Sequence, residues 1–209
     1  IYIQQRDIPI FIIITKSGTI NAEGNQNNYI LFTSNSDNPL FGDWGGIILL
    51  EDNYNNDIDL TEVVFNISDS SFNEIQNVLD FGSSDSNNAN TSENKLKYCK
   101  IHYAGRNISS EYQNDQLTSL TNYNLIGGLT LCGGCPNNAE NNNRFQFIEI
   151  SFSYNYGMLI LGGSPSIKYV VCSHNKNTSI VAYNSGCILD HLFSYINESF
   201  SNFNFIGNY

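Results

Sequence analysis

A cysteine pair, three histidines and one tryptophan are the residues whose types and spacing could carry chemistry in this sequence. Cys132 and Cys135 form a C-x-x-C motif, a pattern found in zinc half-sites, redox pairs and local disulfides. The sequence has no second C-x-x-C and no Cys/His pair that would complete a zinc site. We therefore expect either a disulfide between Cys132 and Cys135 or two free thiols in a glycine turn, with no metal and no cofactor.

The three histidines, His102, His174 and His191, have no adjacent nucleophile that would complete a catalytic triad. We expect His102 to point outward from a strand, and His174 and His191 to occupy inward positions. This pattern favours packed or surface histidines, so no catalytic residue is assigned.

The single tryptophan, Trp44, follows Asp43 in the glycine-rich segment GDWGGI (42–47). The face of a tryptophan ring can stack on a sugar, but a tryptophan flanked by three glycines at a corner of the chain is more typical of a structural plug. The candidates for contact with a carbohydrate or a protein partner are Trp44 and four tyrosines in predicted loops, Tyr54, Tyr112, Tyr154 and Tyr156.

Five N-x-S/T sequons are candidates for N-glycosylation: Asn66, Asn90, Asn107, Asn177 and Asn197. The chain contains 33 Asn, 23 Ser and 9 Thr. This composition alone yields about five sequons by chance, so their number does not by itself indicate a glycoprotein.

The overall composition restricts the class of protein. A length of 209 residues, 41% of them hydrophobic, suits one domain with a real core. Only 14% of the residues are charged, so amides and hydroxyls must cover much of the surface. The net charge of −11 excludes nucleic acid as a partner, because a phosphate backbone would be repelled. No apolar run approaches the roughly 18 residues of a membrane span.

The arrangement of apolar residues predicts a nearly all-β protein. Short runs rich in Ile, Val, Tyr and Phe alternate with Gly, Asn and Ser turns, and the best helical candidate, residues 71–79, is short. The chain begins in a strand-like run without a cleavable signal, so we expect a piece of a longer precursor.

Four segments align without gaps: 96–103 (LKYCKIHY), 145–152 (FQFIEISF), 167–174 (IKYVVCSH) and 188–195 (ILDHLFSY). The last three start 22 and 21 residues apart, a period typical of a solenoid of stacked coils. Asn side chains are expected to stack as amide ladders along its axis. Three alignment columns are expected to point inward: Cys99/Ile148/Val170/His191, Ile101/Ile150/Cys172/Phe193 and Tyr103/Phe152/His174/Tyr195.

These features predict a single β-helix domain over residues 1–209. We expect the first coils in residues 1–50, an irregular loop insertion in 51–95, and regular coils of about 21–22 residues in 96–209 with a loop at 107–123.

The order of several motifs resembles a family of secreted or surface proteins. GDWGGI (42–47) follows GTINAEG (18–24) and ILFTS (30–34), and precedes IHYAG (101–105) and GLTL (128–131). In this order the motifs resemble right-handed parallel β-helix proteins of bacteria that are pectin-lyase-like in fold and mostly of uncharacterised function. The turns at 153–157 and 174–178 lack the Asp-Asp-Gly sequences common in that family, which argues against a calcium site.

The resemblance raises the question of an enzyme, because pectin-lyase-like folds include polysaccharide lyases and hydrolases. The N-T-D, D-D, H-G and R-I-K elements of polygalacturonases are all absent. The nine Lys and Arg residues are scattered, and an acidic chain repels an anionic polysaccharide. We therefore expect a non-enzymatic protein.

We predict a structural protein of the extracellular surface that assembles through its β-helix ends, as a filament or surface-layer subunit. Its expected partners are other copies, other segments of the same precursor, or glycans. The alternatives are a carbohydrate-binding or polysaccharide-processing β-helix and an adhesin.

Overall fold

The computed structural model describes residues 2–3, 10–15, 18–51, 94–106, 126–133, 143–183, 185–198 and 203–206. Every regular element in these ranges is a β-strand. The helical candidate at 71–79 lies outside them, as do nearly all of the predicted loop regions 51–95 and 107–123. Within the same ranges there is no helix that is long and apolar enough to cross a membrane.

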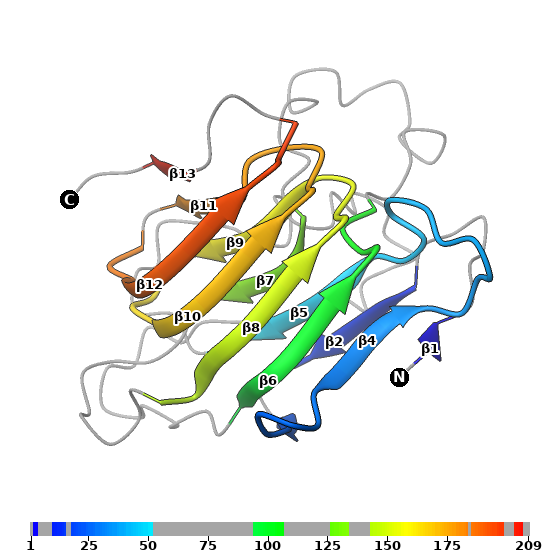
Figure 1. Ribbon diagram of the computed structural model, residues 1–209. Coiled ribbons are helices and arrows are strands. Elements are labelled where there is room, and N and C mark those ends of the chain that lie inside the picture. Colours follow the sequence, from blue (N-terminus) through cyan, green and yellow to red (C-terminus); the bar gives the residue numbers. More distant parts are fainter. Residues whose placement is uncertain are drawn as a thin grey trace, which may run out of the picture.

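The strands form two parallel sheets (Figure 1). The seven-stranded sheet has the order β1 (Tyr2–Ile3), β4 (Ile30–Ser34), β6 (Lys95–His102), β8 (Phe145–Ser151), β10 (Ser166–Ser173) and β12 (Ile188–Tyr195), and β3 (Asn21–Glu23) also pairs with β6. The six-stranded sheet has the order β13 (Phe203–Ile206), β11 (Ile180–Tyr183), β9 (Tyr156–Leu161), β7 (Gly127–Cys132), β5 (Gly46–Leu50) and β2 (Phe11–Ile14).

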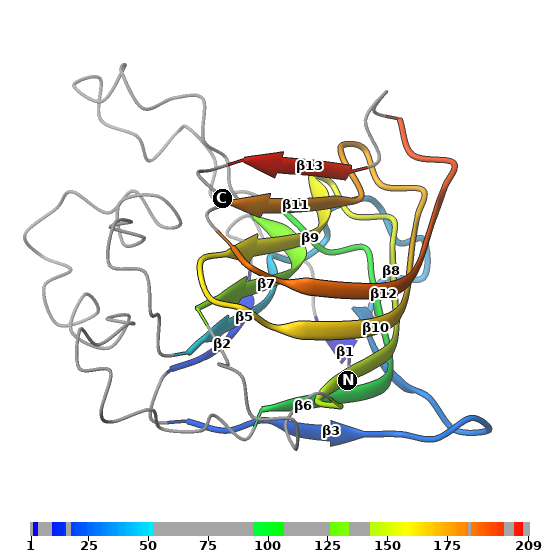
Figure 2. The same ribbon diagram turned by 90° about the vertical axis from the view of Figure 1, so that its left-hand side faces the viewer.

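The two sheets are the walls of a solenoid. Figure 2 shows them facing each other, with the chain passing from one wall to the other and returning one level higher. Parallel neighbours require such crossover connections, because a tight hairpin joins only antiparallel strands. The predicted all-β, right-handed parallel β-helix is confirmed.

The period of the coils is 22 residues from β8 through β10 to β12. Ser151 and Ser173 lie side by side on β8 and β10 and are 22 residues apart. On β12, Leu189 pairs with Ile167, whereas the sequence alignment had placed Ile188 there. The predicted spacing of 21 residues is therefore wrong by one, and this reverses the face assigned to every residue of β12.

The inward column of β12 consists of Leu189, Leu192 and Ser194, because these residues pair with the inward Ile167, Val170 and Cys172. The predicted inward positions of His191, Phe193 and Tyr195 are wrong, and all three side chains are exposed. The other inward assignments in the Cys99 and Ile101 columns are confirmed by their burial.

The two sheets differ in how far their outer surfaces are exposed to solvent. In the six-stranded sheet alternate residues of β5 belong to two separate apolar clusters, with Ile47 and Leu49 inside the solenoid and Ile48 and Leu50 on its outer side. All four side chains are buried, so β5 is covered on both faces. Strands β6 and β8 instead alternate between buried and half-buried residues. The outer surface of the seven-stranded sheet is therefore open to solvent, and we call it the outer face.

Among the described residues, eight other than glycine have positive φ angles, and they form two columns across the outer face. The columns are Tyr98, Phe147, Tyr169 and His191, and Tyr103, Phe152, His174 and Ile196, with φ between 50° and 60°. A left-handed conformation costs an L-residue about 1–2 kcal/mol. Stacking of neighbouring rings at about 0.5–1.5 kcal/mol per pair offsets much of this cost. The predicted inward positions of Tyr103, Phe152 and His174 are wrong, since each bends out of its strand and is half-buried.

The last glycine of GDWGGI, Gly46, permits a close approach between neighbouring coils. Gly46 has a φ of 118°, and a Cβ atom at this position would lie 2.7 Å from the carbonyl oxygen of Gly128. Only glycine fits here without moving the backbone of β7. This explains the requirement for glycine directly before the buried strand β5.

A buried ion pair and its amide neighbour connect the ends of three strands, β5, β6 and β8. Arg144 donates to Glu51 through two bonds, from Nη1 to Oε1 at 3.0 Å and from Nη2 to Oε2 at 3.1 Å. Asn94 Nδ2 donates to Glu51 Oε1 at 3.0 Å, and Asn94 Oδ1 accepts from the Ile20 N–H at 2.8 Å. Glu51 directly follows β5 and Asn94 directly precedes β6, so this network joins the end of one strand to the start of the other.

Candidate functional site

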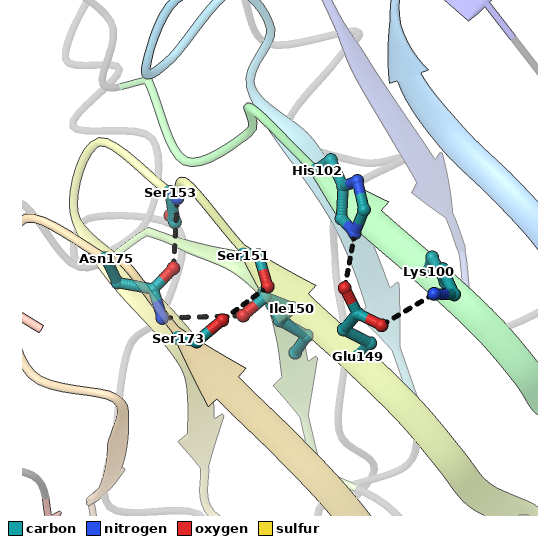
Figure 3. Close-up of polar contacts among 8 residues, drawn as sticks. All are labelled: Lys100, His102, Glu149, Ile150, Ser151, Ser153, Ser173 and Asn175. Atoms are coloured by element: carbon teal, nitrogen blue, oxygen red, sulfur yellow. Dashed lines mark hydrogen bonds and ion pairs between the residues drawn. The ribbon is translucent and has the colours of Figure 1, made fainter. Parts of the chain in front are cut away.

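The outer face carries a polar cluster in the middle of the sheet (Figure 3). Glu149 on β8 lies between Lys100 and His102 on β6, with Glu149 Oε2 2.8 Å from Lys100 Nζ and Glu149 Oε1 2.9 Å from His102 Nε2. Strand β6 places both partners on one face, because residues 100 and 102 are two positions apart in an extended strand. The aligned segments already set Lys100 opposite Glu149, but that opposite-charge column was not recognised as a site.

Lys100 and His102 bind the carboxylate of Glu149 and keep it ionised. The hydrogen bond from His102 and the contacts with Lys100 together lower the pKa of Glu149 to about 2, although partial burial opposes the shift. A carboxyl group with this pKa carries no proton at neutral pH and is unsuited to act as a general acid. Glycoside hydrolysis uses a pair of carboxyl groups, and Glu149 is the only carboxylate in this cluster.

The low pKa of Glu149 predicts a pH dependence of stability. A carboxyl group whose pKa is lower in the folded state stabilises the fold above its ordinary value of 4.5, and this contribution disappears as the pH falls toward 2. We therefore expect the wild type to lose more stability than the Glu149→Gln variant between pH 5 and pH 2, measured by urea unfolding. Equal losses in the two proteins would contradict the assignment.

Aromatic rings flank the cluster as two stacked ladders. In the first, Tyr98, Phe147 and Tyr169 stack with centroids 4.4 and 4.7 Å apart and planes within 7°. In the second, Tyr103, Phe152 and His174 have centroids 4.9 and 5.0 Å apart. Because the ring faces lie against one another, they are not available as platforms for a sugar.

The three histidines occupy the outer face or its ends. His102 points outward as predicted, and its ring contacts Glu149. His174 belongs to the second ladder, and His191 stacks on Tyr169 and forms a 2.6 Å contact with Asp190. No serine or cysteine of the described ranges forms a hydrogen bond with any of these rings.

Trp44 is completely buried and cannot present its face to a ligand. Its ring lies in the apolar interior of the solenoid, and its Nε1–H donates to the carbonyl oxygen of His102 at 2.8 Å. The inclusion of Trp44 among the contact candidates is therefore wrong, and the alternative interpretation as a structural plug fits the burial and the hydrogen bond.

Of the four tyrosines predicted to lie in loops, one is exposed, one is half-buried and two lie outside the described ranges. Tyr154 is exposed, with Lys176 Nζ 4.7 Å from its ring centroid. Tyr156 is the first residue of β9 rather than a loop residue, and burial raises its pKa. Tyr54 and Tyr112 lie outside the described ranges, so their contact role stays a prediction.

Cys132 is a free thiol buried in the outer apolar cluster of the six-stranded sheet. The disulfide between Cys132 and Cys135 is therefore not formed, and Cys135 itself lies outside the described ranges. The alternative of a free thiol fits a position where a buried side chain of β7 packs against apolar neighbours. In the described ranges, no three His, Cys, Asp or Glu side chains gather as metal ligands.

Burial should protect the interior thiols from alkylation. It raises the pKa of Cys99 to about 11 and that of Cys172 to about 12, so neither is a thiolate at neutral pH. We expect iodoacetamide at pH 8 to modify Cys187, which is half-buried, well before Cys99 and Cys172 in the native protein. Peptide mass spectrometry with and without denaturant measures this order, and rapid native labelling of Cys172 would contradict it.

Two sequon asparagines use their side-chain amides within the fold. Asn177 Nδ2 donates to Asn155 Oδ1 at 3.1 Å, and Asn197 Nδ2 donates to Ser179 Oγ at 2.7 Å. Such contacts confirm the expected amide ladders. Glycosylation of any sequon stays a prediction, and Asn66, Asn90 and Asn107 lie outside the described ranges.

A polar ladder also runs through the corners that follow β8, β10 and β12. Figure 3 shows its rung between Ser153 and Asn175. The backbone N–H of Ser153 donates to Asn175 Oδ1, and the backbone N–H of Asn175 donates to Asn197 Oδ1, both at 2.9 Å. Asn175 is fully buried, so its carboxamide replaces the water that these groups would otherwise bind.

An apolar patch lies on and next to β12, where exposed apolar side chains replace the charged residues of the outer face. The outward row that contains Lys100 and Glu149 continues as Val171 and Phe193. The exposed apolar residues around β12 are Ile188 (59%), Phe193 (58%), Tyr195 (49%) and Ile196 (67%). The one-residue error in the alignment concealed this patch, because it placed Phe193 and Tyr195 inside.

Residues 1–124 match the model of a family described as a pectate-lyase-like β-helix domain. No match was found among curated proteins, and none among solved structures.

Proposed function

Because the chain belongs to the pectate-lyase-like β-helix family, we propose that it is a non-catalytic structural β-helix of an extracellular surface, joined to further coils through the edge formed by β12 and β13. The observation that carries this proposal is the apolar patch on β12. Among the described strands, β12 is the last in its sheet, and no other described strand pairs with its outward edge. An unpaired edge beside exposed aromatic and aliphatic side chains is a typical site of protein association.

The polar cluster supports a structural role more than a catalytic one. Glu149 is bound by Lys100 and His102, and the aromatic rings beside it stack on one another. These contacts link neighbouring coils across the outer face. Their chemistry strengthens the stack of coils, because both carboxylate oxygens of Glu149 are bound to side chains of the neighbouring strand.

Association through the edge is tested by light scattering and electron microscopy of the purified chain. We expect self-association that strengthens with salt, because screening reduces the repulsion between chains of net charge −11. The Ile196→Lys variant should remain monomeric at a concentration where the wild type associates, since lysine on an edge disfavours pairing. Leu40→Lys is the matched control, because Leu40 is as exposed (62%) but lies far along the chain from β12.

A wild-type chain that is monomeric at all salt concentrations, with no filaments in micrographs, would contradict the proposal. Association that survives Ile196→Lys and fails in Leu40→Lys would place the contact elsewhere. Intact-mass analysis of the native material tests the extracellular location, since glycan mass at a sequon requires passage through a secretory pathway.

Carbohydrate binding is the second candidate function, favoured by one exposed aromatic ring. Lys100 Nζ lies 4.8 Å from the ring centroid of Tyr29, which is 48% exposed and contacts the first ladder only edge-on. An exposed ring beside a cation and a carboxylate is suited to contact with a sugar. A polysaccharide binding screen with wild type and Tyr29→Ala tests it, and equal retention of both proteins would exclude this site.

A further inference from the structure

We propose that the sequons that begin at Asn177 and Asn197 are rungs of the amide ladders and not sites of N-glycosylation, so that any glycan on the folded chain is carried at another sequon. This inference concerns the corners between coils and goes beyond the proposed function. It follows from the contacts of the two carboxamides, from the burial of the hydroxyl that completes the first sequon, and from the asparagines one coil earlier in the same ladders.

The carboxamide of Asn197 has contacts on both of its polar atoms. Its Nδ2 lies 2.7 Å from Ser179 Oγ, 3.1 Å from Ser194 Oγ and 3.2 Å from the carbonyl oxygen of Tyr195. Its Oδ1 accepts from the backbone N–H of Asn175 at 2.9 Å and from Asn175 Nδ2 at 3.1 Å. Three acceptors therefore surround a nitrogen that carries only two hydrogens. N-glycosylation replaces one of these hydrogens with a bulky sugar, which would need the space that the two serines occupy.

The sequon that begins at Asn177 is engaged along its whole length. Asn177 Oδ1 accepts from the Thr178 N–H at 2.8 Å, and its Nδ2 donates to Asn155 Oδ1 at 3.1 Å. Ser179 supplies the hydroxyl that completes the triplet, but this residue is fully buried and its Oγ lies 2.6 Å from Ser194 Oγ. A glycosylated triplet belongs to an accessible surface loop, so the folded corner does not present this one for modification.

The two sequons are also bonded to each other. Ser179 of the first accepts from the Nδ2 of Asn197 of the second, across 18 positions of the chain. This bond connects the residue directly before β11 to the corner that follows β12. A sugar attached to Asn197 before folding would prevent the corner from closing, so glycosylation of this residue and formation of the corner exclude each other.

The ladder positions one coil earlier carry asparagine without a sequon. Asn155 lies 22 residues before Asn177 and is followed two positions later by Gly157. Asn175 lies 22 residues before Asn197, and the residue two positions after it is an asparagine. Both earlier asparagines are buried. The corner therefore requires the amide of asparagine whether or not a Ser or Thr completes a triplet.

Mapping of glycans in a secretory host tests the inference. The full-length Asp37→Thr variant is secreted from a eukaryotic host, and occupancy of each asparagine in the folded, protease-resistant protein is measured by peptide mass spectrometry. Asp37→Thr completes a triplet that begins at Asn35, which is exposed, and so provides the matched control. We expect a glycan at Asn35 and none at Asn177 or Asn197. A glycan at either of these two residues in the folded protein would overturn the inference.

A pair of variants tests Asn197 without any glycan, and decides the question if the host leaves Asn35 bare. Asn197→Gln and Ser199→Ala destroy the same triplet, but only Asn197→Gln moves the carboxamide away from Ser179 and Asn175. In protein from a bacterial host, we expect Asn197→Gln to unfold at a lower urea concentration than the wild type, and Ser199→Ala to unfold like the wild type. Equal midpoints for the two variants would show that the ladder does not need this amide.

The outcomes are separate from those of the proposed function. Bare Asn177 and Asn197 do not count against an extracellular location, because the inference expects them to be bare in any compartment. Association through β12 is measured on the unglycosylated wild type, so it can fail while the assignment of the two sequons stands.

Discussion

The Glu51→Ala variant is expected to lose about 3–5 kcal/mol of unfolding free energy, because it removes the carboxylate that binds the buried guanidinium of Arg144 through two hydrogen bonds. Both side chains are almost completely buried, with 4% and 5% of their surfaces exposed. The change also removes the acceptor of the Asn94 amide. Chemical denaturation followed by circular dichroism measures the loss, provided that unfolding is two-state.

Two further variants show whether the charge or the shape matters. The double variant Glu51→Leu/Arg144→Met should recover much of the stability, because apolar replacement of both partners removes the uncompensated charge. Glu23→Ala is the exposed control: Glu23 pairs with Lys97 at 3.2 Å, and loss of such a surface pair costs about 0–1 kcal/mol. A Glu51→Ala variant as stable as Glu23→Ala would show that the buried network does not join the coils.

The Trp44→Ala variant is expected to lose about 3–5 kcal/mol, the usual cost of truncating a large buried aromatic residue. Trp44 is fully buried among the interior residues and binds the His102 carbonyl oxygen, so truncation creates a cavity and leaves that oxygen unpaired. The same denaturation experiment measures this loss. Trp44→Phe should lose less, because it retains most of the ring volume.

A surface role for Trp44 would give the opposite pattern. If the ring served a ligand rather than the fold, Trp44→Ala would be as stable as the exposed control Leu40→Ala, for which a change within about 0.5 kcal/mol is expected. Polysaccharide binding measured on the same variants would then decrease without loss of stability.

The fold class could be predicted from the sequence because the positions that must be buried recur at a fixed spacing along the chain. Each coil must bury the same inward column, so residues such as Ile148 and Val170 recur after 22 positions and the repeat is visible in one sequence. The family resemblance of the GDWGGI segment agrees with the same fold, and Gly46 shows why that segment needs glycine.

The register of β12 could not be predicted, because two alignments of the last segment fit the apolar pattern almost equally well. In ILDHLFSY, apolar residues occupy adjacent positions, Ile188 beside Leu189 and Leu192 beside Phe193. Periodicity alone does not choose between them. The stacking of His191 on Tyr169 and the 22-residue rung between Asn175 and Asn197 identify the register in the folded molecule.

The sequence by itself determined the β-helix, its period to within one residue, and the acidic surface, because these depend on residue types and local spacing. Only the tertiary structure decided which groups meet across the coils. Glu51 and Arg144 are 93 residues apart, and Trp44 binds the carbonyl oxygen of a residue 58 positions away. Long segments such as 52–93 separate these partners along the chain, so no local pattern marks them as neighbours. Their contacts arise from the stacking of the coils, and so do the burial of Trp44 and the open apolar edge of β12.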